Sequence, residues 1–427
     1  MENAFHTVVL GGGCLGAASA VAIQRRLRQR GSAGRVLLVD KSVLGAGLSA
    51  RHSGLVRAAN ADRAAAVLAT RAIALWRNLM PHWGVRLPAE QPGAVWIARA
   101  DASGDNPRWR SLQSAMVEAG VAFTRITGER ARELCGAHVK LEQDEVFYHE
   151  PDALQLDPAE IRTALYRAVA ANEIAVREKT VAQGFERADD GRLSAVLTDA
   201  GRFTCEHVIN ACGPWSPSVF GSLGLQIPVS VETVAVINWM MSQRELPGPM
   251  PIIADYSNLA YFRLWPDGAI HMHQPRKRSP RETARAFAEN PLAMMGADFV
   301  TDPANQTLSY AQVRLYEDIV RRRFVGLEPM IFGSGYRSYF DITPDLKFIL
   351  GPDPRVSNLV HCLGAGQSLK YAPVFGEAMA DFVTGGGETA KLVDGFSIAR
   401  FDETYMSTFW AQVAGKHHSL AVEEGGL

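Results

Sequence analysis

The sequence predicts an α/β domain with a parallel sheet, into which an α+β domain with an antiparallel sheet is inserted. The first observation is a glycine-rich βαβ unit at 8–39, in which two short apolar strands flank an alanine-rich helix at 17–30. The second is a set of runs in which apolar and polar residues alternate, as in strands with one buried face. These runs lie at 229–238, 260–265 and 268–273. Because strand and helix patterns resume after 343, the parallel sheet is expected to be discontinuous in the chain.

Length and composition limit the classes of protein to consider. The 427 residues are enough for two or three domains, with 47% hydrophobic residues, 21% charged residues and a formal net charge of −1. This balance argues against a disordered chain and against partners such as nucleic acid or a membrane surface, so we expect a small-molecule partner. The sequence has no apolar run long enough for a transmembrane segment and no secretion signal at 1–6, which favours a cytoplasmic location. Five scattered cysteines without a CxxC motif predict neither a disulfide framework nor a metal site.

The glycines of the βαβ unit have a spacing that suits a pyrophosphate. In Gly11-x-Gly13-x-x-Gly16, the first glycine allows a tight turn, the second removes a side chain where phosphates approach, and the third lets the helix lie close to the strand. The helix N-terminus then offers free N–H groups and a partial positive charge. Asp40 ends the second strand, 24 residues after Gly16, and is placed to accept ribose hydroxyls. The unit therefore predicts a Rossmann-type dinucleotide site.

The loop at 41–57 indicates which kind of dinucleotide. In a nicotinamide enzyme, the second strand leads into another crossover helix, whereas here a loop rich in glycine and serine carries Arg51, His52, Ser53 and Arg57. Clustered donors on a loop of small residues favour a larger, flat cofactor that bears phosphates. A nicotinamide-dependent dehydrogenase remains an alternative.

Together these motifs resemble the FAD-dependent amine and amino-acid oxidoreductases of the sarcosine oxidase, glycine oxidase and dimethylglycine dehydrogenase group. The resemblance rests on the glycine motif, on Asp40 and on the loop Gly47-x-Ser49-x-x-x-Ser53-Gly54. Further matching segments lie at 174–182, 205–215, 343–351 and 358–370, so the resemblance spans residues 6 to about 400. It implies a D-amino-acid-oxidase-like fold with bound FAD.

The resemblance also implies cofactor-binding residues in four parts of the chain. These are Gly11, Gly13, Leu15, Gly16, Asp40, Lys41, Ser49, Arg51, His52, Ser53, Gly54, Leu55, Val181, Ala211, Gly213, Trp215, Gly364, Gly366, Gln367, Ser368, Leu369 and Lys370. A lysine beside a helix N-terminus would stabilise the negative charge that collects at the flavin N1/C2=O edge on reduction.

We expect the FAD to be non-covalent. Sarcosine oxidases attach their flavin to a cysteine where this chain has Ser338, which cannot form the thioether. Dimethylglycine dehydrogenases use a histidine at the position of Arg51, and His52 lies one place later. A covalent bond to His52 is therefore the alternative.

Substrate-binding and catalytic residues follow from the same resemblance. Arg57 and Lys370 match positions that hold a substrate carboxylate, and an arginine can bind a carboxylate through two parallel N–H bonds. For Arg57 the alternative is a structural salt bridge, and for Lys370 an exposed position. Other candidates match less closely: Tyr261 and Phe340 on the substrate side, Arg337 about two residues from a carboxylate-binding arginine, and His271 and His273 near an oxygen-activating lysine. Tyr261 and the two histidines have structural roles as alternatives.

The predicted function is oxidation of the C–N bond of a secondary or N-alkyl amine, an N-methyl or cyclic amino acid, by hydride transfer to flavin N5. Water would hydrolyse the resulting imine, and oxygen or an electron-transfer acceptor would reoxidise the flavin. Three alternatives stay open: a dehydrogenase that passes electrons to a flavoprotein or quinone, oxidation of a 2-hydroxy acid, and a flavin-bearing subunit of a larger complex.

The domain prediction assigns 1–80, 145–222 and 336–400 to an FAD-binding domain and 81–144 and 223–335 to a substrate domain. The tail at 401–427 has no functional interpretation. Helices are expected at 17–30, 62–76, 111–119, 129–134, 158–171, 280–289, 310–323 and 373–383, the fifth with Asp157 as its N-cap.

Overall fold

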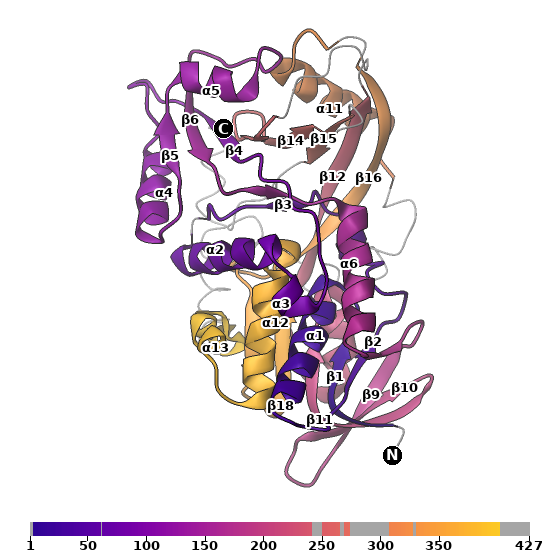
Figure 1. Ribbon diagram of the computed structural model, residues 1–427. Coiled ribbons are helices and arrows are strands. Elements are labelled where there is room, and N and C mark those ends of the chain that lie inside the picture. The colour runs from indigo at the N-terminus through magenta and orange to yellow at the C-terminus, as the bar shows by residue number, and fades with distance from the viewer. Residues whose placement is uncertain are drawn as a thin grey trace, which may run out of the picture.

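Two eight-stranded sheets form the framework of the molecule, one in the lower and one in the upper half of Figure 1. The computed structural model describes residues 3–60, 62–240, 250–264, 269–273, 307–327 and 330–401. The predicted helix at 280–289 and almost all of the tail at 401–427 lie outside these residues.

The first sheet has the order β17-β18-β11-β1-β2-β8. Its parallel strands are β1 (Ala4–Leu10), β2 (Val36–Val39), β8 (Ala175–Arg177), β11 (Gly201–Asn210) and β18 (Val356–Leu363). Antiparallel strands flank them: β9 (Ala182–Arg187), β10 (Leu193–Thr198) and β17 (Ile349–Asp353). A parallel sheet assembled from distant parts of the chain confirms the predicted fold class.

Two helices lie side by side against this sheet, α1 (Cys14–Gln29) and α12 (Ser368–Thr384) (Figure 1). Helix α1 begins three residues earlier than predicted, because Gly13 already has the extended conformation of an N-cap. Helix α12 begins five residues before its predicted start. Pro373 therefore lies inside the helix, where its missing N–H removes only the bond to the carbonyl of Leu369.

The remaining described helices around this sheet are short or begin at an aspartate N-cap, of which Asp157 was predicted. Asp62 caps α2 (Arg63–Arg77) through the N–H of Ala65, and Asp157 caps α6 (Pro158–Ala171) through two N–H groups. Their bounds lie close to the predicted ranges. The other helices are α3 (Met80–Trp83), α7 (Ser216–Phe220) and α13 (Glu388–Leu392).

The second sheet has the order β16-β12-β15-β14-β13-β4-β6-β5. Every neighbouring pair is antiparallel except β13 with β4, which confirms the prediction of a mainly antiparallel sheet. The strands are β4 (Ala94–Arg99), β5 (Thr124–Ile126), β6 (Glu145–Glu150), β12 (Ser230–Met240), β13 (Ile252–Asp255), β14 (Ala260–Leu264), β15 (Ala269–His273) and β16 (Ile331–Ile342). Helices α4 (Pro107–Glu118), α5 (Gly128–Cys135) and α11 (Tyr310–Arg323) accompany it.

The strand pairing places residues 145–150 and 331–342 in the second sheet. Strand β6 pairs with β4 and the whole of β16 pairs with β12, so the second sheet extends to Glu150 and to Ile342. The predicted boundaries at 145 and 336 would divide it. A two-stranded sheet of β3 (Leu55–Val56) and β7 (Leu154–Gln155) lies near this junction.

A buried ionic cluster fastens α11 to the second sheet. The guanidinium of Arg323 donates to Glu145 and to Asp255, each at 2.7 Å, and all three side chains are almost completely buried. Asp255 directly precedes the turn that carries Tyr256, so the cluster fixes one end of a segment that contributes to the site.

Candidate active site

The N-terminus of α1 forms a narrow cradle of backbone. Gly11 has φ +104°, and a Cβ there would lie 2.3 Å from the carbonyl oxygen of Ala211. A Cβ on Gly16 would lie 1.8 Å from the carbonyl oxygen of Gly11. No side chain fits at either position. At Gly13 a Cβ would meet only the hydroxyl of Ser49, so this part of the cradle is open as a phosphate would require.

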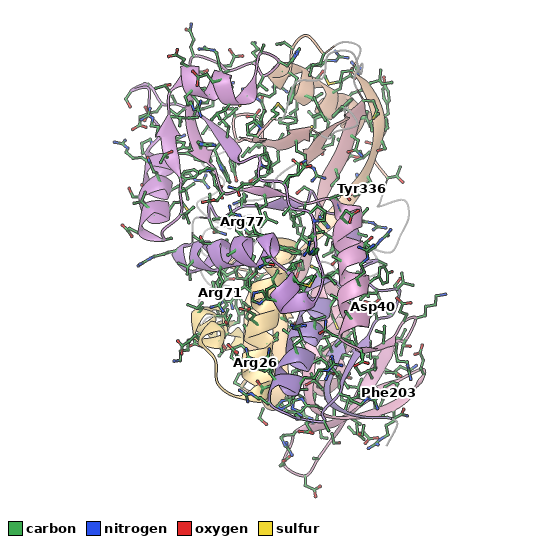
Figure 2. All side chains as sticks on the ribbon, in the orientation of Figure 1. Arg26, Asp40, Arg71, Arg77, Phe203 and Tyr336 are labelled. Atoms are coloured by element: carbon green, nitrogen blue, oxygen red, sulfur yellow. The ribbon has the colours of Figure 1, made fainter. Side chains whose placement is uncertain are left out.

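Polar side chains surround this cradle. Asp40, labelled in Figure 2, accepts the N–H groups of Gly12 and Ser42, each at 2.6 Å, and each carboxylate oxygen keeps a second lone pair for a hydroxyl. Ser49 accepts the N–H of Cys14 at 2.7 Å. The ammonium of Lys41 lies 3.7 Å from the ring centroid of Trp215.

The second glycine-rich turn, at 364–366 before α12, is supported by the buried carboxylate of Asp341. Asp341 lies one residue before the end of β16, is 2% exposed and accepts the N–H of Gly366 at 2.9 Å. Burial raises the pKa of this carboxyl to about 6, although backbone N–H groups of the turn oppose the shift. Asp341 thereby connects the strand that carries Phe340 to the start of α12.

The loop at 51–57 is ordered by local hydrogen bonds. His52 accepts the N–H of Gly54 through Nδ1 at 2.9 Å, so its ring proton is assigned to Nε2. Arg263 from β14 lies under the same loop and donates to the carbonyl of Leu156 at 3.2 Å. Burial lowers the pKa of Arg263 to about 9.

Arg57 and Lys370 lie in one buried ionic cluster with Glu150. Arg57 donates to the carbonyl of Ala59, and the hydroxyl of Tyr261 lies 3.3 Å from its second terminal nitrogen. Burial works against the charge of Arg57, but Tyr261, Tyr256 and Glu150 outweigh it and hold the pKa of the guanidinium above its ordinary value.

Lys370 has a different environment within this cluster. It is 5% exposed, and its Nζ has no hydrogen-bond partner among the described residues. Burial and the nearby charge of Arg57 hold the pKa of Lys370 well below its ordinary value, although Glu150 opposes them. A buried amine without a partner is costly, so a ligand group is expected to complete its bonding.

Glu150 is a residue that sequence reasoning missed. It is completely buried at the end of β6 and accepts the N–H groups of Ala58 and Ala59 and the indole N–H of Trp96 at 3.1 Å. Burial raises its pKa, against the effect of Arg57. The signal in the sequence was weak, because Glu150 follows His149 after the short apolar run Val146-Phe-Tyr148.

Aromatic side chains form the wall beside Arg57. Its guanidinium lies 4.9 Å from the ring centroid of Trp96 and 5.7 Å from that of Tyr261. Tyr256 stacks on Trp96, and its hydroxyl lies 2.6 Å from the hydroxyl of Tyr261. The sequence prediction included Tyr261 but missed Tyr256 and the role of Trp96.

The other predicted substrate residues are not shown to join Arg57 and Lys370. Arg337 donates to Gln312 of α11 at 3.1 Å, so the structure does not bring it together with Arg57 and Lys370. The backbone of β15 pairs His271 with Arg263 and His273 with Tyr261, but the side chains of both histidines lie outside the described part of the structure. The side chain of Ser338 also lies outside it.

The remaining predicted cofactor residues occupy three places. Leu15 is buried in α1, and the N–H of Ala211 bonds to the carbonyl of Leu10 next to Gly11. Ser368 and Leu369 form the first turn of α12, which Gln367 precedes as N-cap. Val181 is 45% exposed, with its N–H bonded to Asp199.

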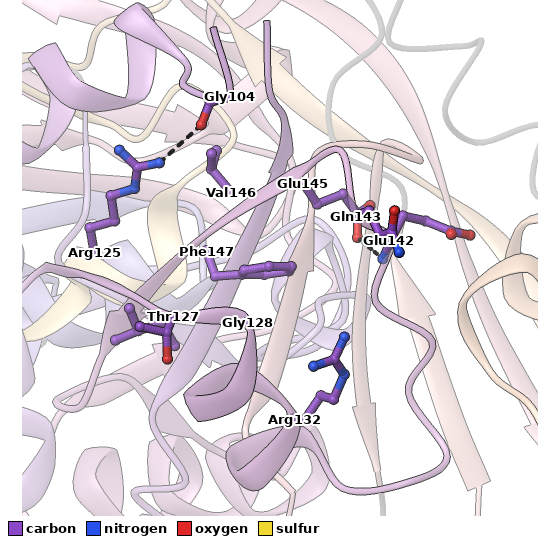
Figure 3. Close-up of a pocket in the computed structure, with 11 residues that line it drawn as sticks. Gly104, Arg125, Thr127, Gly128, Arg132, Glu142, Gln143, Glu145, Val146 and Phe147 are labelled. Carbon is purple, nitrogen blue, oxygen red and sulfur yellow. Dashed lines mark hydrogen bonds between the residues drawn. The ribbon is translucent and has the colours of Figure 1, made fainter. Parts of the chain in front are cut away.

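A hollow of about 590 Å³ lies elsewhere, between α5 and the outer strands of the second sheet (Figure 3). Arg125, Thr127, Glu145 and Phe147 are among its lining residues, and Arg125 donates to the carbonyl of Gly104 at 3.1 Å. None of the predicted site residues lines it. Among the described residues, no group of histidine, cysteine and acidic side chains is arranged to hold a metal ion, and no described helix has the length and apolarity to cross a membrane.

Comparison with known proteins decides the family. The profile of the FAD dependent oxidoreductase family, DAO, matches residues 6–382, which is most of the chain. The chain belongs to this family. The match confirms the predicted family and FAD as the cofactor.

Relatives within the family act on amines. The chain is 24% identical over 398 residues to 4-methylaminobutanoate oxidase (formaldehyde-forming) of Paenarthrobacter nicotinovorans, covering 89% of this chain and 44% of that protein. It is 20% identical to human peroxisomal sarcosine oxidase, and the match covers 94% of this chain and 96% of that protein. It is 21% identical to the mitochondrial dimethylglycine dehydrogenase of Rattus norvegicus, of which it covers 44%. The chain thus spans less than half the length of two of these relatives.

Solved structures agree on the fold. L-proline dehydrogenase from P. horikoshii superposes with a TM-score of 0.77 at 19% identity, covering 94% of this chain and 99% of that one. Glycine oxidase from Geobacillus kaustophilus gives a TM-score of 0.73 at 17% identity, covering 93% and 99%. At these identities the likeness concerns the fold.

Proposed function

We propose that this FAD-dependent oxidoreductase oxidises the C–N bond of a secondary or N-alkyl amino acid, giving an imine that water hydrolyses. The observation that carries the proposal is the buried Nζ of Lys370, which has no hydrogen-bond partner in the described part of the chain and lies in one cluster with Arg57. Two basic side chains, with Glu150 as the one carboxylate that the described residues place beside them, suit a substrate that brings a carboxylate. The names of the relatives, an N-methylamino acid oxidase among them, support the same class.

The residues of the cradle fit FAD. The open backbone at Gly13 and the N-terminus of α1 would receive the pyrophosphate, Asp40 the ribose, and the turn before α12 the flavin end. When bound, the flavin supplies the two-electron acceptor. We propose that it is held without a covalent bond.

The protein's own contribution is orientation. Arg57 is fixed by Ala59 and Tyr261, and can offer two parallel N–H groups to a carboxylate. The wall of Trp96, Tyr256 and Tyr261 excludes water on that side, which strengthens the ionic contact. A bound carboxylate would hold the adjacent C–H in one direction.

A panel of compounds tests the proposal. The purified protein is mixed anaerobically with N-methyl amino acids, cyclic imino acids, D-amino acids, amines without a carboxylate, and 2-hydroxy acids. We expect secondary amino acids to bleach the flavin absorption and the matched amines without a carboxylate to do so poorly. Bleaching by 2-hydroxy acids alone would support the alternative substrate class, and no bleaching by any compound would contradict the proposal. Adding oxygen or an artificial electron acceptor to the reduced protein distinguishes an oxidase from a dehydrogenase.

A further inference from the structure

The position of Lys370 in its helix disfavours a positive charge. It is the third residue of α12, in the first turn, where the helix dipole places partial positive charge. Its backbone carbonyl accepts the indole N–H of Trp76 at 3.0 Å, so the main chain is fixed at this point. The amine is therefore held in a buried place from which it cannot turn to solvent without moving the helix start.

The groups around Nζ leave its charge largely uncompensated. Arg57 adds a second positive charge, and the ring of Tyr371, whose centroid is 4.7 Å away, offers only a weak attraction for a cation. Among the described residues Glu150 is the carboxylate that favours the charge, but its oxygens already accept the N–H groups of Ala58 and Ala59 and the indole N–H of Trp96. Tyr261 and Tyr256 face Arg57. The lowered pKa of Lys370 agrees with this arrangement.

We propose that Lys370 accepts the ammonium proton of the substrate at the moment when the substrate's carboxylate binds. This inference rests on the proposed function. In the step, one N–H bond of the substrate's ammonium breaks, its electron pair stays on the substrate nitrogen, and a new N–H bond forms at Nζ. The zwitterion becomes an amine with a free lone pair, and the neutral lysine becomes an ammonium. No proton is exchanged with solvent.

Binding of the substrate carboxylate and transfer of the proton to Lys370 depend on each other. A secondary amine must be unprotonated before its C–H can leave as hydride, yet the amino acid arrives as a zwitterion at neutral pH. The substrate carboxylate brings a negative charge close to Nζ of Lys370 and to Arg57. Its binding therefore raises the pKa of Lys370, so that the lysine can keep a proton. The same ligand delivers that proton. A carboxylate without an ammonium group has none to deliver, and the lysine must then take one from water.

Proton uptake on binding of butanoate to the FAD-loaded protein tests this assignment. Calorimetric titrations are made at a pH of about 8, where an unperturbed lysine is already protonated, in two buffers of different ionisation enthalpy. We expect close to one proton to be taken up per butanoate bound. Lys370→Arg, which keeps a permanent charge, should bind butanoate without uptake. Glu150→Gln should keep the uptake, because its own carboxyl is not the acceptor.

The outcomes separate this inference from the proposed function. Butanoate binding without uptake in the unmodified protein, or uptake that persists in Lys370→Arg, overturns the inference while the carboxylate site stands. No binding of butanoate or of any amino acid overturns both. A second readout is the rate of flavin reduction by an amino-acid substrate as a function of pH. In Lys370→Arg only the small fraction of substrate whose amine is already unprotonated should react, so this rate should rise about tenfold per pH unit. A profile in Lys370→Arg that matches the unmodified protein would contradict the proton transfer.

Discussion

Three hydrogen-bond donors from the described residues converge on the side chain of Glu150. Its oxygens accept the N–H groups of Ala58 and Ala59 and the indole of Trp96. Only a carboxylate satisfies this set, since an amide of the same shape would turn its NH₂ toward at least one donor. The same segment leads back to Arg57, whose guanidinium lies against Trp96. Glu150 therefore positions Arg57 in addition to balancing its charge.

Replacing Glu150 by glutamine should weaken substrate capture more than it slows the saturated reaction. An unsatisfied buried donor costs about 1–3 kcal/mol, and the segment that carries Arg57 would lose its anchor. The substrate concentration that gives half-maximal flavin reduction should rise several-fold, together with a lower Tm. Glu133→Gln is the matched control, because Glu133 forms an exposed pair with Arg130. Unchanged saturation in Glu150→Gln would contradict the positioning role.

Asp341 should make stability depend on pH in a defined direction. Its pKa is about 6 in the folded protein and 3.8 in its reference state, so the folded state binds the proton more tightly. The free energy of unfolding should therefore fall as pH rises from about 4 to about 6, by at most about 3 kcal/mol. In Asp341→Asn this contribution is absent. With FAD in excess, the Tm of the variant minus that of the unmodified protein should become more positive as pH rises from about 4 to about 7. A constant difference would show that Asp341 does not titrate there.

Part of the proximity of the candidate site residues was predictable from the sequence, while their roles stay a prediction. Arg57, Lys370 and Tyr261 were predicted from three distant segments, and the structure brings them together. Glu150 and Tyr256 were missed because their proximity depends on β4 pairing with both β6 and β13. Arg337 was a weak candidate about two residues from the matching position, and its side chain donates to Gln312 of α11.

At the scale of elements, the packing of α1 on α12 holds the two glycine turns together. A Cβ on Gly376 would lie 2.6 Å from the carbonyl oxygen of Ala18, so this glycine permits the close approach of the helices. Each helix begins directly after one of the glycine-rich turns. A change in the helix spacing would therefore move both ends of the cofactor cradle.

Gly376→Ala should lower both stability and FAD affinity. Overpacking of this kind costs about 1–3 kcal/mol, less up to about 1 kcal/mol regained from the higher helix propensity of alanine. The measurements are the Tm and the dissociation constant for FAD. Gly221→Ala serves as control, since Gly221 has a φ of −60° and no atom within 4 Å of an added Cβ. Equal behaviour of the two variants would mean that the helices separate without cost.

Local signals predicted most elements, and their failures have local causes. Asp157 with Pro158 and the pattern at 310–323 gave helices with the observed ends. The start of α12 was misplaced because a proline usually marks the first turn, whereas here the glycine turn at 364–366 begins the helix. The one parallel pair of the second sheet, β13 with β4, joins segments more than 150 residues apart, so no local pattern could indicate it.

For the whole molecule, the cofactor should be separable from the chain. Ser338 offers no thiol for a flavin bond, and Nδ1 of His52 accepts a hydrogen bond from Gly54. Acid or heat denaturation should release all FAD into the supernatant, and the denatured polypeptide should show no flavin fluorescence on a gel. Fluorescence that stays with the chain would contradict this and would direct attention to His52.

The most direct test of the account is anaerobic rapid mixing of the unmodified protein, Arg57→Met and Lys370→Met with the best amino-acid substrate of the panel, followed by flavin absorption. Each cation contributes about 1.5–3 kcal/mol to a carboxylate contact, so both variants should need roughly ten- to a hundredfold more substrate. Only Lys370→Met should also be slow at saturation, because the amine then has no internal proton acceptor. Reduction rates and saturation like those of the unmodified protein in both variants would contradict the account and would mean that the substrate is anchored elsewhere.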